Sequence, residues 1–136
     1  MEKAFFGRRY TLSASHRLHS AALTDQENRE VYGKCNNPHG HGHNYVIEVL
    51  VGGPVDAETG MVINMATLDE VVQTLILERF DHTNLNFDPL FANHVPTTEN
   101  LTKAVFGVLE NALPTGKLEY VRVEETENNY FEYRGK

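Results

Sequence analysis

The sequence contains a single cysteine, no tryptophan and no long apolar run. One cysteine, Cys35, excludes an internal disulfide, so we expect a protein of a reducing compartment, the cytoplasm. The N-terminal segment lacks the apolar core of a signal peptide. The longest nearly apolar stretch, residues 46–51, is interrupted by Glu48 and is far shorter than the roughly 18 residues that a transmembrane helix needs. We therefore expect no membrane association.

Basic residues are also scarce. The chain has 12 Lys and Arg against 19 Asp and Glu, a formal net charge of −7, which argues against a general nucleic-acid binder. Any polyanionic ligand would need a local basic pocket. A length of 136 residues with 40% hydrophobic and 23% charged residues is typical of one folded domain, residues 1–136. Composition does not explain the seven histidines.

Alternation of side chains with period two predicts four strands. Two lie near the N-terminus, over residues 5–16 and 43–51, and the second includes His41 if the extended backbone begins early. Two more are predicted near the C-terminus, over residues 118–126 and 130–134. Four strands in two separated pairs predict one antiparallel sheet.

Apolar residues at spacings of three and four predict two helices between these pairs of strands. The first has Asn64 as its N-cap and ends near Phe80, and the second begins at Thr97 or Thr98 and ends before Pro114. The predicted fold class is α+β, with a four-stranded antiparallel sheet and two antiparallel helices on one face.

Three histidines are placed so that they could hold one metal ion. Residues i and i+2 of a strand point the same way, so His41 and His43 can reach the same ion, and His16, which ends an inward-facing row, is the candidate third ligand. Three histidines leave a tetrahedral zinc ion one open position, which is the catalytic arrangement. The pair His39 and His41 is an alternative, although Pro38 disfavours regular strand pairing there.

The residues around these histidines are interpreted more simply. Gly40 and Gly42 are expected to relieve crowding between the imidazoles. His19 and His94 lie in polar, loop-like surroundings and are interpreted as ordinary surface histidines. Residues 20–34 are polar and irregular, which predicts a long loop or a short helical turn leading to Cys35.

Cys35 has three interpretations. It could be a fourth zinc ligand, a thiolate base or nucleophile beside the metal, or a buried apolar cysteine. Its neighbours Lys34 and Asn36 are not apolar, and a nearby zinc ion and ammonium group would both favour the thiolate. Such a thiolate could take a proton from a carbon or hydroxyl group that zinc has polarised.

Two acidic positions are further candidates. Asp81 and His82 directly follow the first predicted helix and form either a relay pair or a solvated helix end. If the valines of residues 118–126 face the core, alternation places Glu125 on the inward side and Glu124 on the outward side. A buried carboxylate needs a partner, which the N–H groups of a ligand would supply. The alternative is a strand-end glutamate that reaches water.

Several of these motifs occur together, in order and at matching spacings. Through them the sequence resembles the 6-pyruvoyl-tetrahydropterin synthase family nearly end to end. The resemblance is carried by residues 13–18, 33–45, 50–64 with an Asp-x-x-Thr-Gly-Met turn, 81–82, 97–100 and 125–129. It implies the tunnelling fold, or T-fold, assembled as trimers that pair into a homohexamer, with a pocket shared between subunits.

The resemblance also implies an activity in tetrahydropterin biosynthesis. The family's enzymes are lyases that convert 7,8-dihydroneopterin triphosphate into 6-pyruvoyl-tetrahydropterin and triphosphate, with zinc and a requirement for magnesium. The family's residues fall on catalytic positions Cys35, Asp81, His82 and Glu125, on pterin-binding positions Glu125, Thr97 and Thr98, and on zinc ligands His16, His41 and His43. The basic residues nearest to these in sequence, for the triphosphate, are Lys34, Arg8, Arg9 and Arg17.

Two alternatives remain open at this point. The 6-carboxytetrahydropterin synthase of the queuosine pathway resembles this family in fold, zinc and substrate, but its cysteine usually lies closer to the first zinc histidine. Cys35 lies six residues before His41, which favours the pyruvoyl enzyme, although His39 as the first ligand would restore the shorter spacing. A noncatalytic zinc-binding module, closed by Cys35 as fourth ligand, is the alternative of another class.

Overall fold

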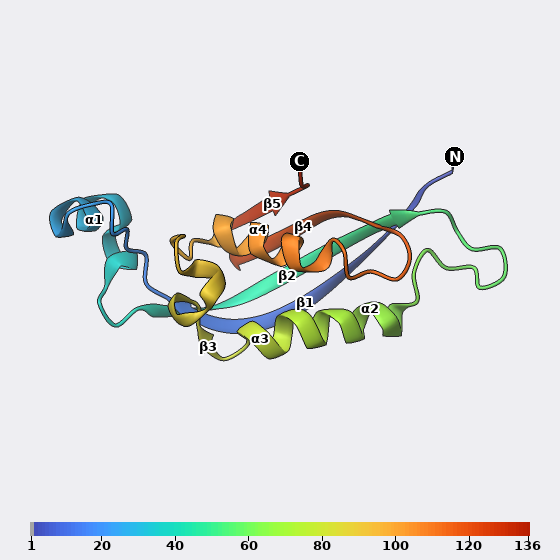
Figure 1. The fold of residues 1–136 in the computed structure, drawn as a ribbon, viewed down its shortest axis with the longest axis horizontal. Helices are drawn as coiled ribbons and strands as arrows, with labels where there is room; N and C mark the ends of the chain where they lie inside the picture. The colour runs from blue at the N-terminus through green and yellow to red at the C-terminus, as the bar shows by residue number, and fades with distance from the viewer. Residues whose placement is uncertain (1) are drawn as a thin grey trace.

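The structure is a computed structural model that describes residues 2–136 (Figure 1). Its strands are β1 (Ala4–His16), β2 (His41–Gly53), β3 (Thr83–Asn84), β4 (Lys117–Thr126) and β5 (Asn129–Tyr133). Its helices are α1 (Asp25–Tyr32), α2 (Met65–Val72), α3 (Glu78–Phe80) and α4 (Thr98–Leu109). Shorter turns are the 3-10 turns η1 (Gly33–Asn36), η3 (Leu85–Phe87) and η4 (Pro89–Phe91), and the π-helical turn η2 (Gln73–Leu77), which joins α2 to α3.

The strands form one sheet in the order β3-β1-β2-β4-β5. The four long strands pair antiparallel, as the sequence predicts, and β1 and β2 are in register from Ala4 opposite Gly53 to His16 opposite His41. The two-residue strand β3 was not predicted and adds a parallel edge beside Ala14 and Ser15 of β1. Two residues are too few to show an alternating pattern.

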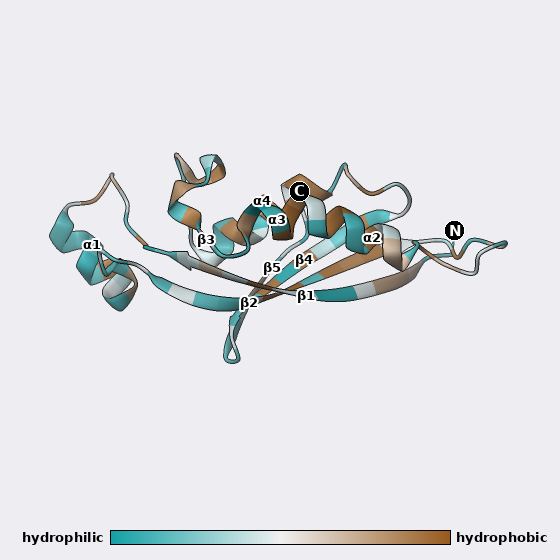
Figure 2. Cartoon of the chain, turned by 90° about the horizontal axis from the view of Figure 1, so that it is seen from below, coloured by the Kyte–Doolittle hydropathy of each residue, from teal (hydrophilic) through white to brown (hydrophobic). Residues whose placement is uncertain are grey.

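The core lies between one face of the sheet and the helices. Figure 2 shows α2, α3 and α4 on the same side of the sheet, which confirms the predicted layers. Inward residues of β2 such as Ile47 and Val49 are fully buried, in one core cluster with Leu68 of α2 and Leu101 of α4. The opposite face of the sheet carries no helix among the described residues. Each strand therefore presents alternate residues to the core and to the bare face.

Side-chain caps fix where the two long helices begin. Asn64 accepts a hydrogen bond from the backbone N–H of Thr67 at 3.1 Å, and Thr97 accepts one from that of Asn100 at 3.1 Å. Both predicted N-caps are confirmed. The first helix continues through the π-helical turn to Phe80, where the backbone of Asp81 becomes extended.

Residues 17–40 form an arm that leaves the sheet at the end of β1 and returns at the start of β2. It contains α1, which Figure 1 shows projecting beyond the end of the sheet. Thr24 and Glu27 form a capping box at its start. The sequence predicts only a loop or short turn there, because a helix with a single buried residue, Asn28, has no apolar stripe. Within residues 2–136, no helix is long and apolar enough to cross a membrane.

Candidate active site

The three predicted metal-binding histidines converge at one end of the sheet. His16 and His41 face each other across the β1–β2 pair, and their Nε2 atoms lie 3.2 Å apart. One ring nitrogen from each of His16, His41 and His43 lies within 4.8 Å of those of the other two. The three rings meet edge to face, with centroids 4.7 to 5.1 Å apart. The structure therefore brings together a group that could hold one metal ion.

Hydrogen bonds fix the orientation of the innermost imidazole. Nδ1 of His16 lies 2.8 Å from the carbonyl oxygen of Pro96 and 3.3 Å from the hydroxyl of Tyr45. Because a carbonyl can only accept, Nδ1 carries the proton, and the lone pair of Nε2 points toward His41. Burial lowers the pKa of His16, so the ring stays neutral. This is the form in which an imidazole binds a metal.

One other ring nitrogen supports a metal site. His43 Nε2 is buried and has no hydrogen-bond partner among the described residues. Buried polar atoms are rarely left without a partner, and a bound cation would use such a lone pair. Burial also lowers the pKa of His43 and so favours its neutral form. These residues fit an ion such as zinc that prefers nitrogen ligands.

The alternative pair of metal ligands, His39 and His41, is excluded by the placement of His39. This residue is exposed in the turn before β2 and lies outside the histidine group. Gly40 adopts a positive φ of 71°, and a Cβ there would lie 3.0 Å from the carbonyl oxygen of His16. A Cβ on Gly42 would make only an ordinary 3.6 Å contact with Ala14. Crowding therefore demands glycine at Gly40 and not, as expected, at Gly42.

Cys35 lies half-buried in η1, at the base of the arm. Its Sγ does not belong to the group of ligand atoms within 4.8 Å of one another, which speaks against a closed four-ligand site. Burial raises the pKa of the Cys35 thiol, and the Glu125 carboxylate raises it further. Lys34 is exposed, and the charged residue that shifts the pKa of the thiol is Glu125.

Glu125 faces the histidines from the end of β4. Its Oε1 lies 3.7 Å from Nε2 of His43, and its Oε2 accepts a hydrogen bond from the hydroxyl of Thr98. Thr98 is buried in the first turn of α4. The Glu125 side chain therefore points to the inward side of the sheet, as strand alternation predicts. The hydroxyl of the neighbouring Thr97 is occupied by its N-cap.

Asp81 and His82 form a second cluster, on the turn between α3 and β3. Asp81 accepts a 2.7 Å hydrogen bond from the backbone N–H of Ser13, which lowers the pKa of its carboxyl, and its other oxygen lies 3.1 Å from Nδ1 of His82. The His82 side chain is 82% exposed, and its backbone has a positive φ of 59°. Such a backbone is uncommon outside glycine and is found preferentially at functional sites.

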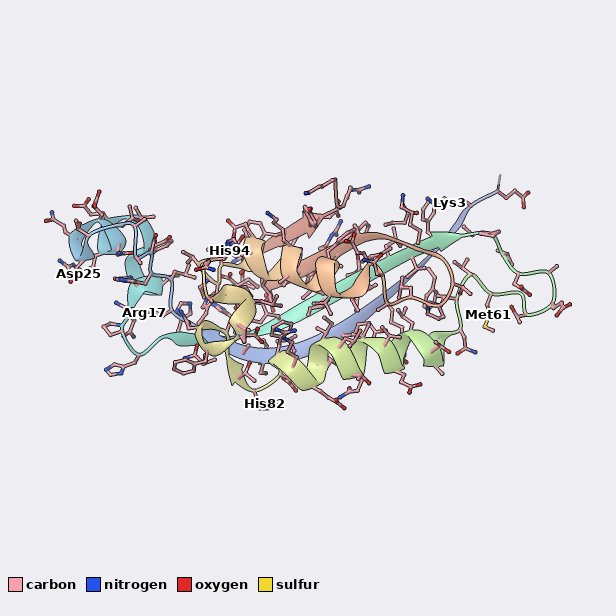
Figure 3. All side chains as sticks on the ribbon, viewed as in Figure 1. Lys3, Arg17, Asp25, Met61, His82 and His94 are labelled. Atoms are coloured by element: carbon pink, nitrogen blue, oxygen red, sulfur yellow. The ribbon has the colours of Figure 1, made fainter. Side chains whose placement is uncertain are left out.

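The structure does not bring this second cluster together with Cys35 and the three histidines. His82 lines a hollow of about 430 Å³ together with His43 of the histidine group and with Ser13, Ser15 and Asn44, which alternate with the inward residues of β1 and β2. The hollow therefore opens toward the bare face of the sheet, at its β3 edge. Figure 3 shows His82 at that edge, below α3. Within one chain, Asp81 and His82 therefore stay outside the histidine group and make no hydrogen bond to it or to Cys35 among the described residues.

The four basic residues expected near a triphosphate are also separated. Arg8 forms a bidentate ion pair with Asp69, and Arg9 pairs with Glu48. Arg17 donates from Nε to the carbonyl oxygen of Asn36 at 3.1 Å, beside Cys35. Of these residues, Arg17 and Lys34 are adjacent in sequence to His16 and Cys35, respectively.

Several residues of the site carry no signal that sequence reasoning detected. The Pro96 carbonyl and the Tyr45 hydroxyl lie within hydrogen-bond distance of His16 and orient it. The side-chain amide of Asn36 donates to the carbonyl oxygen of Leu18 at the base of the arm. His19, interpreted as an ordinary surface histidine, is half-buried and accepts from Asn36. The sequence does not mark Asn36 as important beside Cys35, because its burial is visible only in the structure.

The fold and this site define a T-fold enzyme with a group of three histidines that could hold a metal ion. The profile of the 6-pyruvoyl tetrahydropterin synthase family matches residues 6–136, and the chain belongs to this family. It is 51% identical over 134 residues to the 6-pyruvoyl tetrahydrobiopterin synthase of Drosophila melanogaster (97% of this chain, 80% of that protein). Its identity to the Homo sapiens enzyme of the same name is 48% over 134 residues (98% of this chain, 92% of that protein).

A solved structure agrees with these relatives. The Caenorhabditis elegans 6-pyruvoyl tetrahydropterin synthase superimposes with a TM-score of 0.95 at 41% identity, covering 100% of this chain and 98% of that chain. This likeness confirms the predicted T-fold.

Proposed function

We propose that this chain converts 7,8-dihydroneopterin triphosphate into 6-pyruvoyl-tetrahydropterin and triphosphate. The observation that carries the proposal is the convergence of three imidazoles with Glu125 at one end of the sheet, in a member of this family. The spacing supports the pyruvoyl reaction, because the first histidine of the group that follows Cys35 is His41, six residues later. The overall reaction is an internal redox change, so no external oxidant or reductant is needed.

Glu125 anchors the pterin in this proposal. An ionised carboxylate is a pure acceptor with two oxygens and can bind an amino group and a ring N–H side by side. The hydroxyl of Thr98 holds one of these oxygens and so orients the carboxylate. The other oxygen faces His43, which supports a pterin ring bound beside the histidine group. Thr97 and Thr98 form the adjoining wall.

Cys35 transfers the protons that move between the side chain and the ring. A zinc ion held by His16, His41 and His43 would polarise the side-chain hydroxyl groups and acidify the neighbouring protons. The high pKa of the free thiol means that Cys35 needs a positive neighbour to become a base. Magnesium is the expected partner of the triphosphate, because it binds phosphate oxygens. A free catalytic thiol suits the reducing cytoplasm.

Assembly of several copies completes the site. Asp81 and His82, the proposed relay pair, make no hydrogen bond to Cys35 or to the histidine group within one chain. The sheet also has open edges: β5 has no outer neighbour, and β1 is covered by β3 only at Ala14 and Ser15 among the described residues. Such edges are normally protected, and pairing with other copies would cover them. We therefore assign the relay pair to a neighbouring subunit of a trimer, two of which form the hexamer.

The test is turnover of the zinc-loaded protein with 7,8-dihydroneopterin triphosphate and magnesium, without nicotinamide, followed by mass spectrometry of the pterin. A pyruvoyl side chain and released triphosphate are the expected products. A carboxyl group with acetaldehyde would assign the chain to the 6-carboxytetrahydropterin reaction. No product from a zinc-loaded oligomer would overturn the proposal. Cys35→Ala, loaded with zinc in the same way, is the matched blank.

A further inference from the structure

Cys35 is carried by a part of the chain that has little support of its own. The arm of residues 17–40 extends beyond the sheet, and α1 packs chiefly on η1 within the same arm (Figure 1). The thiol at its base nevertheless has to be placed accurately relative to the histidine group. The position of Cys35 therefore depends on the hydrogen bonds where the arm joins the body.

Asn36 ties the returning end of the arm to its outgoing end, residues 17–19. Its Nδ2 donates to the carbonyl oxygen of Leu18 at 2.7 Å and to Nδ1 of His19 at 3.1 Å. Its backbone carbonyl accepts from Nε of Arg17 at 3.1 Å. The preceding carbonyl, that of Cys35, accepts from the backbone N–H of Leu18 at 2.8 Å. Asn36 is only 6% exposed, so water does not compete for these bonds.

The segment that receives these bonds is itself tied to the body of the molecule. Arg17 follows the last residue of β1, His16. Its backbone N–H donates to Oδ1 of Asn86 at 2.7 Å, and its carbonyl accepts from Nδ2 of Asn86 at 2.9 Å. A continuous set of hydrogen bonds thus runs from the body through residues 17–19 to Asn36. Arg17, where this set begins, directly follows His16, which is a member of the histidine group.

We propose that Asn36 is a positioning residue for the reaction, whose buried amide fixes Cys35 relative to His16. The inference rests on the proposed role of Cys35. A reacting group that is misplaced by about 1 Å can lose roughly a hundredfold in rate. Asn36 makes no hydrogen bond with the histidine group or with Glu125 among the described residues, so we expect its removal to preserve metal binding and the pterin anchor.

Asn36→Ala is the test, and Asn28→Ala is its matched control. Asn28 is a buried asparagine of the same arm, and its amide also binds several groups, the carbonyl oxygens of Ser20, Leu23 and Thr24. None of these lies beside Cys35. We expect Asn36→Ala to lower kcat about ten- to a hundredfold with unchanged KM and zinc content, and Asn28→Ala to keep the wild-type kcat.

A second readout follows the thiol itself. Cys35 is the only cysteine, so alkylation by iodoacetamide, measured by mass spectrometry, reports on it alone. Loss of the Asn36 amide frees the thiol, and we expect faster alkylation of the zinc-loaded Asn36→Ala protein, at a rate that Asn28→Ala does not reach.

The proposal is overturned if Asn36→Ala keeps kcat within about twofold of wild type, or if Asn28→Ala loses as much. Failure of the proposed function is distinguishable, because it appears as no product from the wild-type protein, and failure of the proposed role of Cys35 appears as full turnover by Cys35→Ala. The alkylation result is independent of turnover. If Asn36→Ala does not fold, His19→Ala takes its place. It removes one acceptor of the Asn36 amide, and a smaller decrease in kcat with faster alkylation is expected.

Discussion

Thr98 donates its hydroxyl proton to Glu125, so the first turn of α4 is hydrogen-bonded to the end of β4. Two residues earlier, the carbonyl oxygen of Pro96 accepts the Nδ1 proton of His16. Residues 96–98 thus bind both the histidine group and the proposed pterin anchor. A rigid N-terminal turn of α4, fixed by the Thr97 cap, sets the distance between the two.

Replacement of Thr98 by valine tests this link. The side chains have the same shape, so Thr98→Val keeps the packing but leaves Glu125 without its donor. A hydrogen bond to a charged group contributes about 1.5 kcal/mol or more, so we expect KM for the pterin to rise about tenfold with little change in kcat. Thr102→Val is the control, because Thr102 is equally buried but donates only to the carbonyl of Thr98. Equal KM values for the two variants would contradict the link.

Metal analysis separates a catalytic centre from a structural one. We expect His41→Ala to lose zinc, because two imidazoles hold the ion far less tightly than three, and Cys35→Ala to keep zinc and fold while losing turnover. Zinc stoichiometry by elemental analysis and thermal unfolding of both variants give the answer. Loss of zinc from Cys35→Ala would show that the thiol is a ligand and that the centre is closed.

Local patterns in the sequence predict the elements that carry the site. Alternation along two strands places His41 and His43 on the side of His16, and the same rule turns Glu125 inward. The N-caps Asn64 and Thr97 are equally visible, because the capping side chain and the helix it starts are adjacent in the chain. These inferences depend on side-chain direction within one element, which the backbone period fixes.

Contacts between distant segments could not be predicted in this way. The Pro96 carbonyl binds His16 across 80 residues, and a carbonyl group has no signature in a sequence. Asp81 and His82 are easily recognised as a pair, but their face is decided by the hydrogen bond of Asp81 to Ser13. Helix α1 is held by its capping box rather than by an apolar stripe.

Tyr45 is expected to strengthen metal binding through His16. The ring is fully buried, and its hydroxyl lies 3.3 Å from Nδ1, where it accepts a second branch of the hydrogen bond that Nδ1 donates to Pro96. Partners of this kind typically change metal affinity ten- to a hundredfold, so we expect Tyr45→Phe to bind zinc about tenfold more weakly. Chelator competition measures this. Tyr10→Phe, which removes a hydroxyl bound to Asp69, should bind zinc like wild type.

Mixed oligomers test the shared site. Cys35→Ala and His82→Ala are each expected to be inactive, but if the two residues come from different subunits, some sites in a mixed assembly contain both wild-type groups. Random mixing of equal amounts gives about a quarter of the wild-type activity, since each site needs two independent wild-type contributions. Unfolding and refolding the variants together, followed by the turnover assay, provides the measurement. A mixture as inactive as its components would place both residues in one subunit.

The bare face of the sheet contains a charge network that should make the fold sensitive to acid. Glu48 on β2 accepts hydrogen bonds from Tyr120 and Arg9, which lower the pKa of its carboxyl. Because the folded pKa lies below the unfolded one, ionised Glu48 stabilises the fold above the unfolded pKa, and this contribution disappears as the pH falls through the folded pKa. Its side chain is 14% exposed, so solvent screens the network only in part.

We expect Glu48→Gln to lower the free energy of unfolding by about 1 kcal/mol at pH 7 and by less in acid, where the wild-type carboxyl is itself protonated. Urea unfolding of both proteins at pH 7 and near pH 3 shows whether the difference narrows. Glu124→Gln is the control, because Glu124 lies opposite Tyr130 and forms no ion pair within residues 2–136. A difference between Glu48→Gln and wild type that stays constant with pH would assign the loss to packing rather than to the charge.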